Sequence, residues 1–139
     1  MPDVTDHDLI REYARSGSEE AFGELAHRHV DLVYSTAFRV VRNASFAEEV
    51  TLRVFVALAR NATKLQHRAV LTGWLHETTR NFAITTVRSE ERRRQREQKA
   101  ATLETPATAE SRARHRLWKW RVHPDAGANF KSFMAFVSP

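Results

Sequence analysis

Residues 22–41 read FGELAHRHVDLVYSTAFRVV, and apolar or small side chains return along this stretch every three or four residues. Such spacing places one side of an α-helix against a core, so the stretch predicts one long amphipathic helix. We expect the helix to begin after Ser18, whose hydroxyl can cap the first turn, and to end at Arg42-Asn43. The core side of the predicted helix carries Phe22, Leu25, Ala26, His29, Leu32, Val33, Thr36, Ala37 and Val40.

Two shorter helices are expected on either side of the long one. Thr5 is a suitable cap for a first helix that runs to about Arg15, where Ser16-Gly17-Ser18 breaks it. Ser45 with Glu48 has the spacing of a capping box, which predicts that a further helix opens there and continues to about residue 60.

The second half of the chain predicts one more helix and then a change of character. Residues 61–71 are expected to form a loop, with Thr72 as the cap of a last helix that runs from Gly73 to about Ala101. Residues 102–139 predict a linker around Pro106 and a poorly ordered tail, with at most a short helix near residues 109–121.

The predicted fold class is all-α, because glycine and proline occur only four times each in 139 residues. A chain of this length with 42% hydrophobic residues is expected to form one compact domain, here a bundle of about four helices over residues 1–101. Residues 102–139 are then the linker and tail, without a second folded domain.

The composition excludes several classes of protein. The chain has no cysteine, so it can form neither a disulfide framework nor a thiolate metal site. Its first 20 residues are acidic and polar where a secretion signal is basic and then apolar, and no run of 18 apolar residues occurs. We expect a cytoplasmic protein that has no membrane partner.

Charge is distributed unevenly along the chain. Residues 1–60 hold seven Lys or Arg against ten Asp or Glu, whereas residues 61–101 hold nine against four and residues 102–139 hold six against three. The basic segment after residue 61 favours a polyanionic partner there, and the acidic first half favours a different one. A solvated basic helix without a ligand is the alternative.

No catalytic, metal or cofactor site is predicted. His27 and His29 are two residues apart on a helix and therefore point to different faces, which makes a poor pair of metal ligands. His76 and Glu77 are adjacent, whereas an acid and a base on one helix face are three or four residues apart.

The helix expected over residues 46–60 has two apolar faces. Phe46, Ala47, Val50, Val54, Ala57 and Leu58 share the arc that faces its own core, and Leu52, Phe55, Val56 and Ala59 lie on the opposite side. A helix in a small bundle is seldom apolar all round. Either a further helix of the same domain buries the second face or that face is a docking surface.

The last predicted helix carries a polar stripe beside its core-facing arc of Leu75, Thr78 and Phe82. Arginine and lysine neutralise phosphates, an asparagine amide can bond a base edge, and a tryptophan ring can stack on an unpaired base. In the alternative interpretation Trp74 packs in the core and the interleaved glutamates pair with the arginines. The stripe consists of Trp74, Asn81, Thr85, Arg88, Arg92, Arg96 and Lys99.

The order of these segments resembles a known family. FGELAHRHVDLVYSTAFRVVRN, then AEEVTLRVFVALAR, then LTGWLHETTRNFA and a basic helix are similar to the second conserved region of bacterial sigma factors of the extracytoplasmic function group. The likeness covers about residues 20–100. It implies a helical domain that docks on the clamp helices of the largest subunit of core RNA polymerase and recognises and melts the minus-ten promoter element through its non-template strand. An anti-sigma protein is a further partner that the resemblance allows.

The resemblance also implies which residues face each partner. Relatives commonly read A-E-D-L-x-Q-E-V-F in the polymerase-binding helix, and Ala47 to Phe55 corresponds to it with Leu52 in place of Gln and Arg53 in place of Glu. In relatives a tryptophan opens the promoter-reading helix and an asparagine follows seven residues later, as Trp74 and Asn81 do here. The implied polymerase-binding residues are Glu48, Glu49, Leu52, Arg53, Phe55 and Val56, and the implied DNA-binding residues are Lys64, Arg68, Trp74, His76, Arg80, Asn81, Thr85, Arg88, Arg92 and Arg93.

Family members normally carry a second helical domain that reads the minus-thirty-five element, and the 38 residues after Ala101 are too few for it. A truncated or frame-altered product, a single-domain piece and a natural variant all remain open, and each predicts weak or no autonomous initiation. A second class of function also stays open, namely a non-catalytic helical module that binds another protein and touches nucleic acid without sequence preference.

Overall fold

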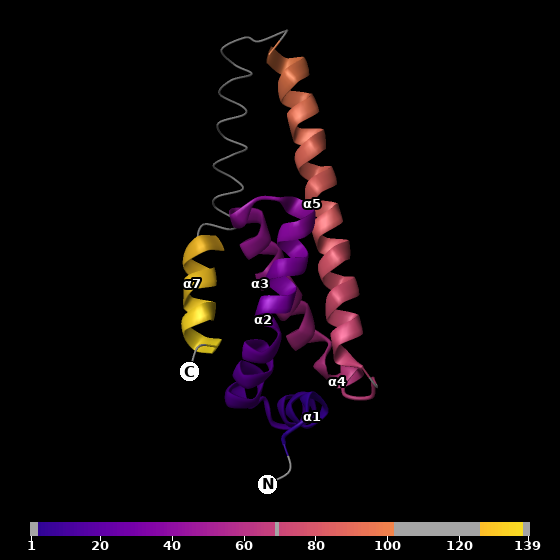
Figure 1. The fold of residues 1–139 in the computed structure, drawn as a ribbon, viewed down its shortest axis with the longest axis vertical. Helices are drawn as coiled ribbons and strands as arrows, with labels where there is room; N and C mark the ends of the chain where they lie inside the picture. Colours follow the sequence, from indigo (N-terminus) through magenta and orange to yellow (C-terminus); the bar gives the residue numbers. More distant parts are fainter. Residues whose placement is uncertain (1–2, 69, 102–125, 138–139) are drawn as a thin grey trace.

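The computed structural model describes residues 3–68, 70–101 and 126–137, and within these residues every regular element is a helix. The predicted all-α class is therefore confirmed. Helices α2, α3 and α5 pack on one another, α1 crosses the lower end of α2, and α7 lies on the side of the bundle opposite α5 (Figure 1). The helices are α1 Asp6–Ser16, α2 Glu19–Val41, α3 Ala44–Arg60, α4 Ala62–Leu65, α5 Leu71–Ala101 and α7 Ala126–Val137.

Local capping signals set the ends of the first two helices. The Thr5 hydroxyl accepts a hydrogen bond from the Asp8 backbone N–H, and the Asp8 carboxylate accepts one from the Thr5 backbone N–H, which completes a capping box. Gly17 ends α1 with a φ of 68°, a left-handed conformation that suits a residue without a Cβ. Ser18 caps α2 as predicted, by accepting from the Ala21 N–H.

The start of α3 and the segment before α5 differ from the predictions. Asn43, and not Ser45, caps α3, because the Asn43 side-chain oxygen accepts from the Phe46 N–H at 3.1 Å and the helix has already begun at Ala44. The loop expected over residues 61–71 contains the single turn α4. Helix α5 begins at Leu71, so Thr72 lies inside its first turn and does not precede it.

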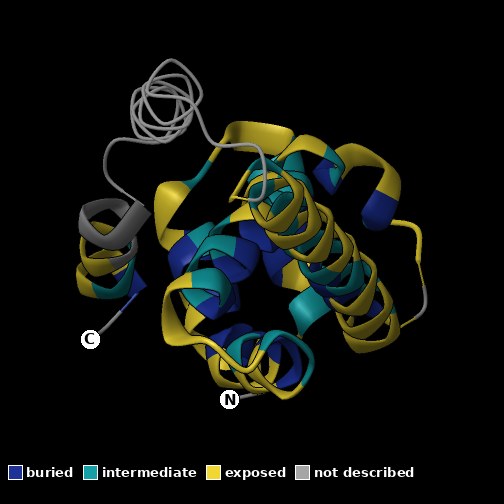
Figure 2. Ribbon diagram, turned by 90° about the horizontal axis from the view of Figure 1, so that it is seen from above, coloured by how far each residue is buried: buried dark blue, intermediate teal, exposed yellow. Residues whose placement is uncertain are grey.

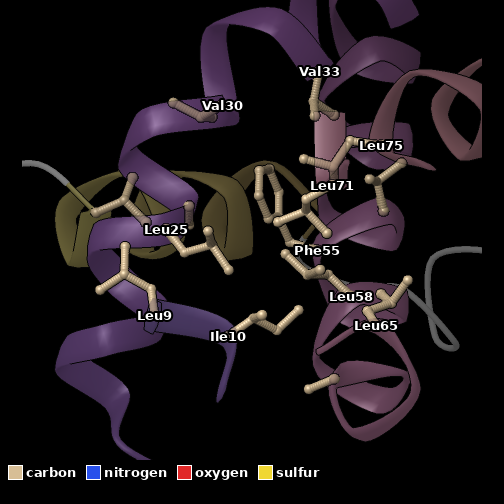
Figure 3. Close-up of a cluster of buried hydrophobic side chains, with 14 of the residues drawn as sticks. Leu9, Ile10, Leu25, Val30, Val33, Phe55, Leu58, Leu65, Leu71 and Leu75 are labelled. Carbon is tan, nitrogen blue, oxygen red and sulfur yellow. The ribbon is translucent and has the colours of Figure 1, made fainter. Parts of the chain in front are cut away.

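The core lies where α2, α3 and α5 face one another, and buried residues gather there when the bundle is viewed from above (Figure 2). Leu25 and Val33 of α2 and Leu75 of α5 are completely buried in it. Figure 3 shows that Leu9 and Ile10 extend this cluster from α1 and that Leu65 and Leu71 extend it at the α4–α5 end. The predicted core side of residues 22–41 is largely confirmed, although Leu32 remains 37% exposed.

Two threonines lie inside the apolar core, and the hydroxyl of each has a hydrogen-bond partner. Thr51 and Thr79 are completely buried, and each hydroxyl donates to the backbone carbonyl four residues earlier, at 2.7 and 2.6 Å. A buried hydroxyl without a partner costs free energy, so these bonds allow both side chains to be packed as small core residues.

Helix α7 was not among the helices that the sequence predicted. It packs on α3 and also contacts α2. The Phe133 ring lies against Phe55 of α3 with centroids 5.1 Å apart, and Val137 is buried in the main core cluster. Part of the second apolar face of α3 is therefore covered by a helix of the same chain. The helix expected near residues 109–121 lies outside the described residues.

Candidate nucleic-acid interface

Helix α5 rests on the bundle through only its first half. Its buried residues are Leu71, Leu75, Thr79 and Ala83, which follow one another at intervals of four. The core-facing arc was predicted through Thr78 and Phe82, which the structure leaves half-buried at the border of this row. Side chains at intervals of four residues form one of the ridges through which helices pack. Because α5 packs through this ridge, its buried face is rotated slightly around the helix axis from the predicted arc.

Beyond Ala83 no residue of α5 is buried, and the helix continues past the ends of α2 and α3 (Figure 1). Residues 84–101 hold six Lys or Arg against three Asp or Glu. Few described side chains of this segment pack on the bundle, so its exposed face can be reached by a partner in solution. Its net positive charge favours a partner that is an anion.

One side of α5 presents a line of exposed polar and basic side chains, which we call the outward row. The Thr85 hydroxyl donates to the Asn81 backbone carbonyl at 2.9 Å, whereas the Asn81 side-chain amide makes no hydrogen bond within the described residues. No described carboxylate lies within salt-bridge distance of Arg88 or Arg92. The outward row consists of Asn81, Thr85, Arg88, Arg92, Arg96 and Lys99, all of them exposed.

Trp74 stands at the border between this row and the core. Its side chain is partly buried and packs against the buried cluster, so one part of the indole is held by the domain and another part reaches solvent. Packing of this kind fixes the orientation of the ring. A partly exposed and oriented ring is a suitable surface for an unpaired base.

The remaining α5 residues of the predicted DNA-binding set are arranged differently. Arg93 is half-buried, and its guanidinium binds Glu90 at 2.8 Å and Glu97 at 3.2 Å, so its charge is already paired on the helix. His76 and Arg80 are exposed, and ideal helical geometry places them about 160° and about 120° around the helix axis from Trp74. Neither residue therefore belongs to the outward row.

Before α5, a surface pocket of about 230 Å³ opens between the start of α1 and the α4–α5 connection. Arg68 lines it, and Lys64 is exposed on α4 nearby in sequence. Sequence reasoning missed the opposite wall, which Thr5, Asp6 and His7 form. Only the tertiary placement of α1 against α4 brings this wall to the pocket.

Asp6 in that wall is held by two residues of α2. His29 Nε2 lies 2.6 Å from Asp6 Oδ2, and because a carboxylate only accepts, the imidazole N–H donates. Arg28 donates to Asp6 Oδ1 at 3.3 Å and to the Val4 carbonyl at 2.7 Å. These bonds fix the start of α1 on α2, so the pocket wall has a defined position.

The structure does not leave the six predicted polymerase-binding residues equally open. Arg53 and Val56 are exposed, the latter by 50%, whereas Phe55 is only 2% exposed because α7 and the core enclose it. Glu48, Glu49 and Leu52 are half-buried.

No helix among the described residues is long and apolar enough to cross a membrane. The same residues contain no group of three or more histidine or acidic side chains arranged to hold a metal ion.

Comparison with known proteins gives a family for most of the helical domain. The family model "Sigma-70 region 2" matches residues 25–93. The ECF RNA polymerase sigma factor SigE of Mycolicibacterium smegmatis is 34% identical over 68 residues, which are 49% of this chain and 26% of the relative. The ECF RNA polymerase sigma factor SigK of Mycobacterium sp. strain KMS is 30% identical over 106 residues, which are 74% of this chain and 55% of the relative. No solved structure matches the chain significantly.

This chain spans between about a quarter and about half of the length of these relatives. The matched segment runs from Leu25, in the first half of α2, through α3 and α4, to the basic part of α5, and so includes the outward row up to Arg92. The order of segments, the all-α bundle and the two kinds of match agree with one another. The chain belongs to the sigma-70 region 2 family, among the sigma factors of the extracytoplasmic function group.

Proposed function

We propose that this chain is a non-enzymatic transcription initiation factor that docks on core RNA polymerase and captures the non-template strand of a minus-ten promoter element. The observation that carries the DNA part of the proposal is the outward row of α5. Within the described residues, the Asn81 amide has no hydrogen-bond partner, and Arg88 and Arg92 have no carboxylate partner. An amide can read a base edge, and guanidinium groups without a carboxylate partner can hold phosphates.

The arrangement divides the work along one helix. Trp74 and Asn81 lie near the start of α5, where the domain holds the helix, and they are the proposed contacts to an unpaired base. Arg88 and Arg92 lie further along the exposed part and are the proposed contacts to the backbone. The pocket lined by Arg68 and Asp6 is the proposed receiver of a base that leaves the stack. Stacking and hydrogen bonds in such a pocket offset the free energy of unpairing.

The test does not depend on which promoter the chain recognises. A pool of random single-stranded DNA is incubated with the full chain, and the bound strands are sequenced. We expect a short enriched motif, and we expect Asn81→Ala to lose the enrichment while it retains part of the binding. Gln98→Ala is the matched control, because Gln98 is an exposed amide near the end of the same helix. Binding without enrichment would instead support the non-catalytic interaction module.

A second measurement uses one enriched strand. Removal of Trp74 by substitution with Ala should lower affinity by about 1 to 3 kcal/mol if the ring stacks on a base. Because the ring also packs on the core, the unfolding midpoint of the variant is measured alongside. A loss of affinity that follows the loss of folded protein would assign Trp74 to packing alone.

Docking on polymerase is proposed for the part of α3 that stays open. Val56 is an exposed apolar side chain on the second face of that helix, and Val4 at the start of the chain has nearly the same exposure, 51% against 50%. We expect Val56→Asp to weaken capture of core polymerase and Val4→Asp to leave it unchanged. Equal capture by both variants would exclude this face as the docking surface.

A further inference from the structure

Helix α7 lies on the surface that the proposed function assigns to polymerase. It packs on α3 and reaches α2, on the opposite side of the bundle from α5 (Figure 1). Phe55 is one of the six predicted polymerase-binding residues, and it is buried with its ring 5.1 Å from that of Phe133. A partner that needs the Phe55 side of α3 therefore has to displace α7.

The contact on α2 is close enough to be a specific seat. Gly23 is buried beneath Phe136, and a Cβ at residue 23 would lie 3.3 Å from Phe136 Cζ. The absence of a side chain at Gly23 thus lets the aromatic ring approach the helix backbone. Val137, the next residue, is 4% exposed and belongs to the main core cluster.

The same contact is small enough to be reversible. Helix α7 has 12 residues, and helices of this length are marginal by themselves in water, so its helical state depends on the surface beneath it. Among the described side chains of the helix only Val137 is fully buried, Phe133 and Met134 are partly buried, and Phe136 remains 47% exposed. A larger apolar partner on α3 could replace these contacts.

From these contacts we infer that α7 is an intramolecular cover that competes with core RNA polymerase for the second face of α3. The inference rests on the proposed function, because it names the regulation of the same docking surface. When α7 is packed on α3, the outward row of α5 stays exposed, but only the part of the second face of α3 around Val56 is open to polymerase. With α7 displaced, Phe55 and its neighbours become available.

A disulfide between residues 23 and 136 tests the inference within one protein. The natural chain has no cysteine, so Gly23→Cys with Phe136→Cys introduces a single possible pair. The Phe136 carbonyl oxygen lies 3.8 Å from the position of a Cβ at residue 23, so the backbone at residue 136 approaches residue 23 closely, as a bridge requires. Oxidation locks α7 on α2, and reduction leaves α7 free to dissociate from it.

We expect the oxidised double variant to bind core polymerase at least about tenfold more weakly than the reduced form, because apparent affinity falls with the fraction of chains whose docking face is free. The reduced form should bind at least as well as the natural chain, since it lacks the Phe136 ring. Phe133→Ala should also strengthen binding. Lys131→Ala is the control, because Lys131 is exposed on the same helix.

The possible failures are distinguishable. Equal polymerase binding by the oxidised and reduced forms would overturn the cover and leave the proposed function intact. Absence of binding by every form, including Phe133→Ala, would overturn the proposed docking itself. Thiol titration checks the bridge independently of polymerase, and failure of the two cysteines to pair would overturn the placement of α7 on which the inference depends.

Discussion

Substitution of Asp6 by Ala tests how the start of α1 is fastened to the bundle. The carboxylate accepts from His29 at 2.6 Å and from Arg28 at 3.3 Å, and the side chains of Asp6 and His29 are 30% and 11% exposed. A hydrogen bond to a charged group contributes about 1.5 to 3 kcal/mol, and a partly exposed ion pair adds up to about 1 kcal/mol. Asp6 is also an acidic residue in the first turn of α1, where a negative charge is favourable.

After a discount for solvent at the exposed part of the carboxylate, we expect Asp6→Ala to lower the free energy of unfolding by about 2 kcal/mol. Asp6→Asn retains an acceptor for the His29 N–H and should lose about half as much. Urea denaturation followed by circular dichroism gives both values. Asp3→Ala is the control, because Asp3 is an exposed acid just before the helix and no bond to it is described.

A change below about 0.5 kcal/mol for Asp6→Ala, or one equal to that of Asp3→Ala, would refute this reasoning, because surface substitutions commonly have effects of that size. It would mean that the apolar contacts of Leu9 and Ile10 hold α1 in place without help from the polar group. A confirmed loss should be accompanied by weaker binding of the enriched single strand, since Asp6 lies in the wall of the pocket next to Arg68.

Three further outcomes are expected. The backbone N–H of Thr5, together with the Thr5 hydroxyl, holds the pKa of the Asp8 carboxyl below its usual 3.8. The stability that Asp8→Ala removes at pH 7 should therefore become smaller as the pH falls below about 3.8, because protonation weakens the same bonds. Urea titrations of both proteins at each pH measure this difference. Gly17→Ala should lower the free energy of unfolding by about 1 kcal/mol. The backbone φ of 68° accounts for this loss, because an added Cβ would have no described atom within 4 Å and would cause no clash. For single-stranded DNA, Arg88→Ala should flatten the plot of log affinity against log salt by about 0.7, whereas Arg93→Ala should change it less because two glutamates already pair with Arg93.

The helices that could be predicted are those whose signals are local. The apolar spacing of residues 22–41 and the caps at Thr5 and Ser18 lie within the elements that they specify, and the structure confirms them. The start of α3 was misplaced because Asn43 and Ser45 are both good caps within one turn. Only the observed hydrogen bond to the Phe46 N–H distinguishes between them.

Helix α7 could not be predicted for the opposite reason, since the surface that stabilises it comes from distant parts of the chain. Its contacts are made by Phe133, Phe136 and Val137, and their partners include Phe55 and Gly23. The second apolar face of α3 did indicate that a cover or a partner was needed, but it left the choice open. The pocket wall at Asp6 was missed in the same way, because it exists only once α1 is placed beside α4.

The candidate site shows the same division between local and distant information. The exposure of Arg88 and Arg92 followed from the helical stripe, and so did the position of Trp74 at the edge of the core. The pairing of Arg93 with Glu90 and Glu97 could have been recognised from spacings of three and four residues.

Because α5 is one uninterrupted helix of 31 residues, it acts as a ruler between the proposed base contact and the proposed phosphate contacts. At about 1.5 Å per residue, the backbones of Asn81 and Arg92 are separated by roughly 16 Å along the axis. Insertion of one alanine after Thr86 would lengthen this separation by only about 1.5 Å but would turn every later arginine by about 100°. Whether one strand can touch both groups therefore depends on their rotation around the helix axis. A change of that rotation would separate the two proposed contacts although every contacting side chain is still present.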